Sequence, residues 1–395
     1  MDIDKTETIL ITCGRGIVPY LSKEVGELGY KVESSHNTGI EISASLRDTM
    51  KLNLALRTAY HVLYLLKKFS CNNPDELYKE IASFPWEDVV APSEYLSVIS
   101  RTDTPAINNS VFASQKMKDA IVDRISEKCG SRPSSGPGKD NVVINFYWKD
   151  DKCWVYLNTS GKKLSDRGYR KIPHKAPLQE TLAAALLRAA RFDGSQSLVN
   201  PMCGSGTLAI EAALIALKRA PGLLRNNFGL QHMIGFDPLA WIALRKEMNA
   251  RSSKKLPFRI IASDIDKKAI QAAKKNAQTA GVERMIEFYV CDFKDTPMPE
   301  EKGIVILNPE YGLRLGSAEE LEKTYKSIGD FFKNKCSGFT GYIFTGNMAL
   351  AKKVGLRTSR RLIFFNAKIE CRLLEYEIYA GSKEKNGNAP GALEL

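Results

Sequence analysis

Hydrophobic and polar residues in the first 160 positions of the chain follow two different periods. Short apolar or alternating runs predict strands at 7–12, 38–43, 94–100, 142–148 and 153–159. Apolar residues spaced three or four positions apart predict helices at 16–28, 46–67, 74–82 and 113–128. Because these strands and helices do not alternate regularly, this half of the chain is predicted to be α+β.

The pattern changes at residue 178, where predicted strands and helices begin to alternate. Strands are predicted at 197–200, 259–263, 286–290, 303–307 and 340–345, and helices at 178–191, 207–218, 267–280, 318–334 and 347–353. Such alternation predicts an α/β domain with a mostly parallel sheet covered by helices on both faces. Two further strands at 360–366 and 371–379 are expected to form a C-terminal antiparallel hairpin. The segment 219–257 is an insertion without a strand pattern, and the polar tail 382–395 is expected to be disordered.

The net charge of the chain indicates a polyanionic binding partner. The chain has 395 residues with 57 basic and 45 acidic side chains, so its net charge is +12 and its surface attracts polyanions. The segment 161–177 is polar and basic, and we predict that it is an exposed linker. Arginine pairs with phosphate and an aromatic ring stacks on a base. We therefore expect nucleic-acid contacts from Lys162, Arg167, Tyr169, Arg170 and Lys171.

Cysteine and histidine usage argues against a metal site, because the eight cysteines are scattered and only four histidines are present. The polar N-terminus does not resemble a signal peptide, and no apolar run approaches the roughly 20 residues that span a bilayer. We expect a cytoplasmic protein without a membrane partner. The sequence does not indicate the oligomeric state.

A glycine-containing loop between a predicted strand and helix is the first candidate site. The loop reads Asn-Pro-Met-Cys-Gly-Ser-Gly-Thr at 200–207, and its glycines let the backbone approach a ligand at a helix N-terminus. The spacing Gly204-x-Gly206-x-x-Ala209 also fits the dinucleotide fingerprint, so nicotinamide binding is an alternative. The fingerprint expects an acid about 20 residues later, but Asn226 and Asn227 occupy that distance. The next carboxylates, beginning with Asp264, follow the second strand of the domain.

Two more loops follow predicted strands of the same sheet. Asp292 comes after the third strand, where its carboxylate can accept a hydrogen bond from an adenine amino group or simply start a turn. The fourth strand runs into Asn308-Pro309-Glu310-Tyr311. The Asn308 side-chain oxygen and the Pro309 carbonyl can accept the two hydrogens of an exocyclic base amine and aim its lone pair at a methyl donor. Tyr311 can stack on a base extruded from its helix.

These segments together resemble one family. The runs 167–170 (Arg-Gly-Tyr-Arg), 176–185 and 200–213 look like the THUMP-domain RNA methyltransferases. Among these, the bacterial 23S ribosomal RNA guanine-N2 methyltransferases, often labelled adenine-N6 DNA methylases, are the most similar. The run 114–123 resembles the THUMP helix, and the likeness extends from about residue 7 to 380.

The resemblance implies a domain order: a ferredoxin-like unit at 1–60, a THUMP RNA-binding domain at 61–160, and a class I, Rossmann-like methyltransferase domain at 178–381. It implies S-adenosylmethionine as the cofactor and structured RNA, most of all 23S ribosomal RNA, as the partner. Asp264 is expected at the ribose and Asp292 at the adenine. The other cofactor residues implied are Glu180, Thr181, Pro201, Met202, Cys203, Gly204, Gly206 and Thr207. Lys116 and Lys118 of the THUMP helix are expected to contact RNA.

One residue departs from the family pattern. The catalytic loop of the family is Asn-Pro-Pro-Tyr, and Glu310 replaces the second proline here. Its carboxylate can accept hydrogen bonds from guanine, or it can repel RNA. Three alternatives to guanine-N2 methylation of 23S RNA stay open. The Asn-Pro-x-Tyr loop also fits a tRNA guanine-N2 or an adenine-N6 methyltransferase, and Glu310 leaves a non-catalytic RNA-binding factor possible. The glycine loop leaves a nicotinamide oxidoreductase as the third.

Overall fold

A computed structural model describes residues 2–172, 177–312 and 318–379, which form two sheets with their helices. The first sheet has eight strands in the order β2-β3-β1-β4-β8-β7-β5-β6. Its strands are β1 (Thr6–Cys13), β2 (Val32–His36), β3 (Gly39–Ser45), β4 (Ala59–Ser70), β5 (Tyr95–Asp103), β6 (Ser134–Ser135), β7 (Val142–Lys149) and β8 (Lys152–Asn158). Its helices are α1 (Val18–Glu27), α2 (Asp48–Ala55), α3 (Pro74–Ala82) and α4 (Ser110–Cys129).

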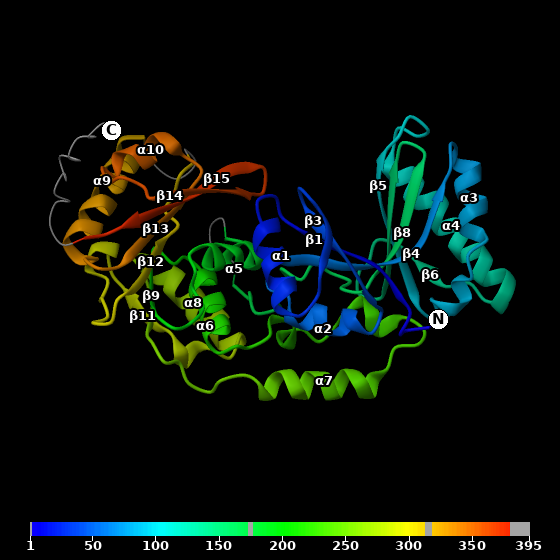
Figure 1. Ribbon diagram of the computed structural model, residues 1–395, viewed down its shortest axis with the longest axis horizontal. Helices are drawn as coiled ribbons and strands as arrows, with labels where there is room; N and C mark the ends of the chain where they lie inside the picture. Colours follow the sequence, from blue (N-terminus) through cyan, green and yellow to red (C-terminus); the bar gives the residue numbers. More distant parts are fainter. Residues whose placement is uncertain (1, 173–176, 313–317, 380–395) are drawn as a thin grey trace, which may run out of the picture.

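Strand β4 joins the two N-terminal units into this one sheet. It is 12 residues long and is antiparallel to β1 on one side and to β8 on the other. The predicted helix at 46–67 is therefore wrong beyond α2. The run Ala59–Leu66 is apolar enough to fit either period, and pairing with two distant strands decides the outcome. The expected boundary at residue 60 falls inside β4, which crosses between the units in Figure 1.

The second sheet has the expected α/β architecture. Its strands are β9 (Ser197–Pro201), β10 (Ile260–Asp264), β11 (Glu287–Val290), β12 (Gly303–Leu307), β13 (Thr340–Thr345), β14 (Arg360–Asn366) and β15 (Ile369–Glu377). Their order is β11-β10-β9-β12-β13-β15-β14, and only β15 and its partners pair antiparallel. The predicted fold class, with its C-terminal hairpin, is confirmed. The order reverses at β9, which places a ligand crevice beyond the carboxyl ends of β9 and β12.

Helices cover both faces of this second sheet. They are α5 (Glu180–Ala189), α6 (Thr207–Ala216), α8 (Lys267–Thr279), α9 (Ala318–Lys335) and α10 (Met348–Lys353). The insertion 219–257 contains α7 (Pro238–Ala250), which runs outside both sheets (Figure 1) and packs Trp241 against Phe228 and Phe236. Among the residues that the structure describes, no helix has the length and hydropathy needed to cross a bilayer. The tail expected to be disordered, 382–395, lies outside the described residues.

The predicted exposed linker is wrong for its central residues. Leu164, Arg167 and Tyr169 are each 1% exposed. Arg167 forms an ion pair with Glu211 of α6 at 3.5 Å, and Tyr169 donates a hydrogen bond from its hydroxyl to the same carboxylate at 3.1 Å. Neither residue is placed to bind RNA, because a guanidinium and a phenol that are already buried against a carboxylate cannot reach a phosphate or a base.

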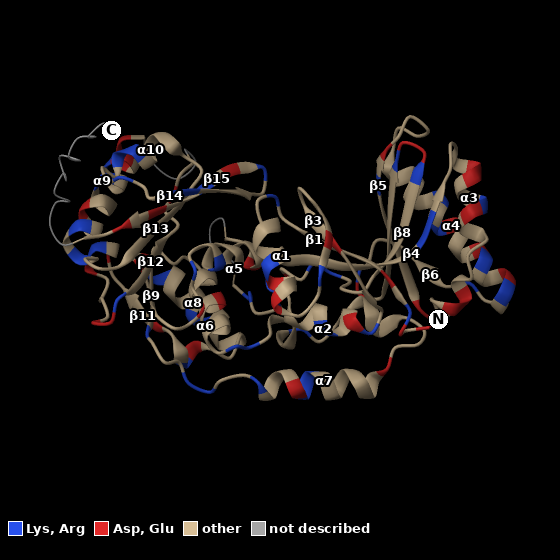
Figure 2. Cartoon of the chain, in the orientation of Figure 1, with Lys and Arg blue, Asp and Glu red and all other residues tan. Residues whose placement is uncertain are grey.

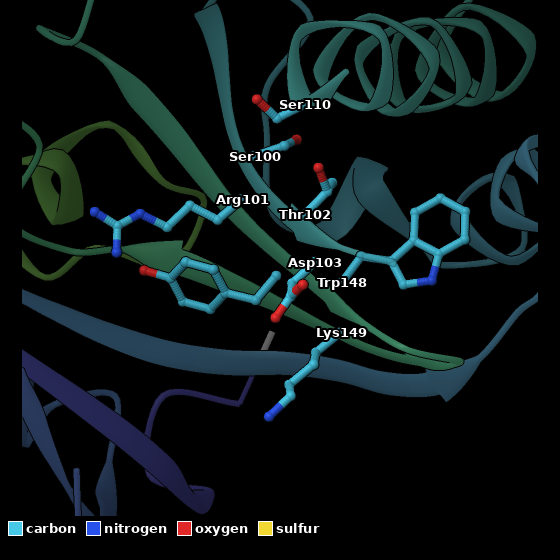
Figure 3. Close-up of a pocket in the computed structure, with 8 residues that line it drawn as sticks. Ser100, Arg101, Thr102, Asp103, Ser110, Trp148 and Lys149 are labelled. Atoms are coloured by element: carbon cyan, nitrogen blue, oxygen red, sulfur yellow. The ribbon is translucent and has the colours of Figure 1, made fainter. Parts of the chain in front are cut away.

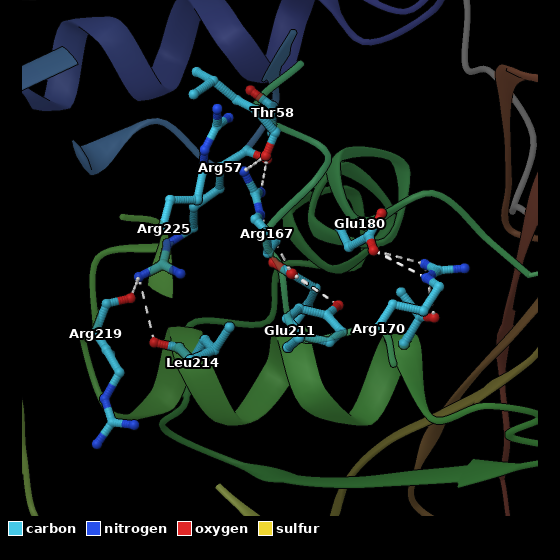
Figure 4. A network of polar contacts seen from close by, with 12 residues as sticks. Arg57, Thr58, Arg167, Arg170, Glu180, Glu211, Leu214, Arg219 and Arg225 are labelled. Carbon is cyan, nitrogen blue, oxygen red and sulfur yellow. Dashed lines mark hydrogen bonds and ion pairs between the residues drawn. The ribbon is translucent and has the colours of Figure 1, made fainter. Parts of the chain in front are cut away.

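Figure 4 shows that this buried cluster also holds the N-terminal unit. Arg167 donates to the Leu164 carbonyl at 2.6 Å and to the Arg57 carbonyl at the start of β4. Arg57 donates in turn to the carbonyls of Leu214 and Arg219, at 3.3 Å and 2.8 Å. Glu24 of α1 accepts from the Arg57 amide at 2.9 Å. The ferredoxin-like unit and the methyltransferase domain are thus connected through buried charges.

Glu211→Gln tests how much this cluster contributes to the stability of the fold. The substitution keeps the volume but leaves the Arg167 guanidinium buried without a carboxylate, which costs about 3–5 kcal/mol in the free energy of unfolding. Urea denaturation measures the loss. The matched control is Glu247→Gln on α7, which breaks an exposed pair with Arg251 and is expected to leave the urea midpoint unchanged. Equal midpoints for the two variants would contradict a central role for Glu211.

Candidate cofactor and catalytic site

The predicted cofactor residues meet where β9, β10 and β11 end. Pro201 ends β9, Thr207 begins α6, and the loop between them turns under the carboxyl end of β10. The Cys203 amide donates to the Ser263 carbonyl at 2.9 Å. Beyond β10, the Cys291 amide donates to the Asp264 carbonyl at 3.1 Å. These backbone bonds place the three loops along one edge of the sheet.

The two glycines of the β9 loop serve different purposes. Gly206 has φ +83°, and a Cβ there would lie 2.9 Å from the Cβ of Ala273, so its absence lets α8 pack close to the loop. Gly204 has φ +54°, and no atom of the described chain lies within 4 Å of the position that its Cβ would take. Met202 is also in the left-handed region, with φ +55°. The backbone at Gly204 is therefore open on the side where a ligand can approach.

Asp264 ties the loop after β9 to the loop after β10. Its carboxylate accepts from the Gly204 amide at 2.9 Å and from the Asp266 amide at 3.0 Å. Asp292 is placed similarly after β11, where its carboxylate accepts from the Lys294 amide at 3.0 Å and stays 35% exposed. Ile265, which the sequence analysis missed, directly follows Asp264. It is 72% exposed and offers apolar surface just beyond the carboxyl end of β10.

Glu180 and Thr181 begin α5 next to this edge, and both are buried. Arg170 donates to Glu180 at 3.0 Å, to the Leu178 carbonyl at 2.5 Å and to the Thr207 hydroxyl at 3.3 Å (Figure 4). Burial raises the pKa of Glu180, and Arg170 opposes that rise. The prediction that Arg170 binds RNA phosphate is wrong, because its guanidinium instead joins α5 to the N-terminus of α6.

The loop after β12 carries an acceptor without a donor. Asn200 of β9 donates to the Ile306 carbonyl at 2.9 Å, which holds β12 beside β9. Two residues on, the Asn308 Oδ1 is buried, and no donor in the described part of the chain lies within hydrogen-bond distance. Buried polar atoms are nearly always paired. Pro309 is buried and Glu310 is exposed. The loop therefore presents an acceptor that a bound molecule can satisfy.

Tyr311 is held by the C-terminal hairpin. Its hydroxyl accepts from the Asn366 amide group at 2.9 Å, and its ring meets Phe344 edge-to-face with centroids 6.4 Å apart. Burial raises the pKa of Tyr311 to about 12, so the phenol is neutral at physiological pH. The ring is thereby fixed beside the loop.

The four lysines predicted to bind RNA are on the surface, and three of them have acidic partners. Lys116 pairs with Asp75 at 3.2 Å, and Lys118 pairs with Asp119 at 3.1 Å. Lys162 pairs with Asp140 at 2.6 Å, whereas Lys171 is exposed beside the cofactor edge. Their contacts with RNA stay predictions. In the described part of the chain, no group of three or more histidine, cysteine or carboxylate side chains could hold a metal ion.

Comparison with known families assigns each part of the chain. A family model described as the RMKL-like methyltransferase domain matches residues 167–375, just over half of the chain. The chain belongs to this family. Models of the RlmL ferredoxin-like domain and of the THUMP domain match residues 8–63 and 71–158. The predicted THUMP-domain class I RNA methyltransferase architecture is confirmed.

Curated relatives agree with this membership. A protein of Syntrophotalea carbinolica named ribosomal RNA large subunit methyltransferase K/L is 38% identical over 93% of the chain, which covers 53% of that protein. The chain thus spans about half the length of the K/L relatives. Slr0064 of Synechocystis, provisionally named an RNA methyltransferase, is 34% identical over 95% of the chain and is itself covered to 97%.

Solved structures share the fold along the whole chain. The structure of SMU.472, solved with SAH, covers 96% of this chain and 100% of its own with 24% identity and a TM-score of 0.85. A predicted N6-adenine-specific DNA methylase from Listeria monocytogenes is 28% identical, covers 95% of this chain and 97% of its own, and has a TM-score of 0.84. Membership of a methyltransferase family confirms S-adenosylmethionine as the predicted cofactor and argues against the nicotinamide alternative.

Gly204→Ala separates ligand contact from backbone strain. A side chain in the left-handed region costs about 1 kcal/mol of stability, and at Gly204 it also fills the open approach, so affinity for S-adenosylhomocysteine should fall at least tenfold by calorimetry. Gly130→Ala is the matched control, because Gly130 ends α4 with φ +70° and equally open space. It should lose the same stability and no affinity. Equal cofactor affinities for both variants would place the cofactor elsewhere.

Proposed function

We propose that this chain transfers a methyl group from S-adenosylmethionine to the exocyclic N2 of a guanine in 23S ribosomal RNA. The observation that carries the proposal is the buried, unpaired Asn308 Oδ1 beside the Pro309 carbonyl, at the carboxyl end of β12. This loop follows the strand next to β9, whose glycine loop opens to the cofactor. The ribosomal RNA names of the K/L relatives support the choice of substrate.

The cofactor site is proposed from the three loops of the sheet edge. Gly204 and Gly206, near the N-terminus of α6, would hold the methionine part, Asp264 would hold the ribose hydroxyls, and Ile265 and Asp292 would hold the adenine. The cofactor, when bound, supplies an electrophilic methyl group. The Asp264 carboxylate, which accepts from the backbone amides of Gly204 and Asp266, keeps the loops in place before binding.

The target amine is oriented by two acceptors. Its lone pair is delocalised into the guanine ring, which makes it a weak nucleophile. When Asn308 Oδ1 and the Pro309 carbonyl accept its two hydrogens, the lone pair is directed away from the ring toward the methyl donor. The amine nitrogen would then form a bond to the methyl carbon as the bond from that carbon to the sulfonium sulfur breaks, which leaves S-adenosylhomocysteine, and the amine would lose one proton to solvent. Positioning and fixed dipoles supply the acceleration without a strong base.

Glu310 and Tyr311 complete the base site in this proposal. The exposed Glu310 carboxylate can accept from N1–H of guanine, a group that adenine lacks, and this favours N2 of guanine over N6 of adenine. Tyr311, anchored by Asn366, stacks on the extruded base.

The deciding experiment is transfer of tritium from labelled S-adenosylmethionine to total RNA from a strain that lacks this gene. Label recovered as N2-methylguanine in 23S RNA supports the proposal. Label in tRNA, or label recovered as N6-methyladenine, would show that the chain transfers a methyl group but that the proposed substrate is wrong. Cofactor binding without any label indicates a non-catalytic RNA-binding protein.

Asn308→Ala is expected to lower kcat at least a hundredfold, because the amine loses one of its two acceptors. Affinity for S-adenosylhomocysteine should stay within twofold of wild type, because Asn308 is not part of the loops proposed to hold the cofactor. Single-turnover methylation and calorimetry measure the two quantities. Asn249→Ala, at an exposed position on α7, is the control for the substitution itself. Full activity of Asn308→Ala would remove Asn308 from the mechanism.

A further inference from the structure

Four strands of the first sheet align a row of basic and aromatic side chains. The register pairs Lys68 of β4 with Trp154 of β8, Trp154 with Tyr147 of β7, and Tyr147 with Arg101 of β5. Directly opposed residues on neighbouring strands project from the same face of a sheet. The four side chains therefore form one line across the strands, with a cation at each end and two aromatic rings between them. We call this line the aromatic row.

The aromatic row lies on the face of the sheet that α3 and α4 do not cover. On β7 and β8 the neighbouring residues Phe146, Trp148, Cys153 and Val155 are buried in the core, and the residues of the row alternate with them. Lys68 and Arg101 are exposed, and the two rings are partly exposed. The Lys68 ammonium lies 5.8 Å from the centroid of the Trp154 ring. At about 4.8 Å per strand, the row spans roughly 14 Å.

A cavity of about 440 Å³ opens at the Arg101 end of the row. Arg101 and Tyr147 of the row line this cavity, and so do Asp103 and Lys149, each two residues further along its strand (Figure 3). β6 pairs with β5 only at Tyr95 and Leu96, so no other strand in the described part of the chain pairs with this side of β5 beyond Leu96. The row thus ends in a recess that holds both a cation and hydrogen-bonding groups.

Basic residues continue from the row toward the methyltransferase domain. His61 of β4 lies on the same face, and its pKa is lowered to about 3, first by burial and then by the nearby charges of Lys163, Lys139, Arg225 and Arg101. These four cations come from separate parts of the chain. All four are near enough to the His61 ring to lower its pKa.

On the opposite face of this domain, which α3 and α4 cover, basic side chains pair with neighbouring carboxylates. Lys116 pairs with Asp75, and Arg124 pairs with Glu87 at 2.5 Å. Tyr78 donates to Asp123 at 2.8 Å. Acidic and basic residues both occur along α3 and α4 in Figure 2. A phosphate backbone gains little from Lys116, Lys118, Arg124 and Lys128, because each of them already pairs with a carboxylate.

We propose that the aromatic row binds unpaired nucleotides of the RNA substrate, with bases stacked on Trp154 and Tyr147 and phosphates paired with Lys68 and Arg101. Stacking on aromatic rings flanked by cations is how proteins bind single strands with little sequence preference. The inference rests on the proposed function in taking RNA as the substrate, and it moves the RNA contact from the α4 lysines to the open face of the sheet. Double-stranded RNA cannot use the row, because its bases are not available for stacking.

The test compares binding of a fluorescently labelled single-stranded 12-mer of uridine with binding of a 12-base-pair RNA duplex. Trp154→Leu should weaken single-strand binding at least fivefold, and Trp154→Phe should restore most of it, because a phenyl face still stacks. Arg101→Ala and Lys68→Ala should each reduce the slope of log Kd against log salt by about 0.7. The matched control is Lys116→Ala on the helical face, which should change neither quantity. Duplex binding should be unchanged in the Trp154 variants.

Fold and function are checked separately in the same proteins. Far-ultraviolet circular dichroism and cofactor affinity show that a variant is folded, and Arg101→Ala and Lys68→Ala alter exposed side chains. Wild-type single-strand binding by Arg101→Ala and Trp154→Leu would overturn the proposal even if RNA is methylated. Loss of binding in Lys116→Ala alone would place the RNA on α4 and overturn it as well. Absence of methyl transfer, with single-strand binding lost in the row variants, would refute only the proposed function.

Discussion

The buried carboxylate of Glu211 is the constraint on which the arrangement of the chain depends. A fully buried charge is costly unless a partner and hydrogen bonds compensate it. Arg167 and Tyr169 supply that compensation, and Arg167 also binds the carbonyl of Arg57. Glu211 lies one turn into α6, whose N-terminus forms the cofactor loop. The position of the cofactor loop is therefore coupled to the N-terminal unit through one buried cluster.

A second contact couples the N-terminal unit to the loop after β12. Tyr20 of α1 stacks on Phe364 of β14 with centroids 5.4 Å apart, and the Arg15 guanidinium lies 4.0 Å from the centroid of Phe365. The next residue of β14 is Asn366, which holds the Tyr311 hydroxyl. The N-terminal unit thus contacts both α6 and β14 of the methyltransferase domain. RNA bound as proposed on the aromatic row would therefore keep a defined position relative to the loop after β12.

The sequence predicts local features of this molecule better than those set by distant partners. Strands β9 to β13 and the loops after them follow from apolar runs and from glycine and proline positions, because each is decided within about ten residues. Strand β4 was mistaken for helix, since its two pairing partners are far away in the sequence. Arg167 and Tyr169 were assigned to RNA because their compensating carboxylate, Glu211, lies 42 residues or more beyond them. Ile265 and the aromatic row carry no motif and emerge only from exposure and register.

The replacement of a family proline by Glu310 is compatible with this geometry. The acceptor Asn308 directly follows β12, a fully buried strand that pairs with β9 and β13. Tyr311 is fixed from the other side through Asn366 and Phe344. Glu310 lies between these two anchored residues with its side chain exposed, so the rigidity that a proline would add is supplied by the neighbouring contacts. Glu310 thus adds a negative charge to the loop after β12, while the contacts that hold Tyr311 do not involve its side chain.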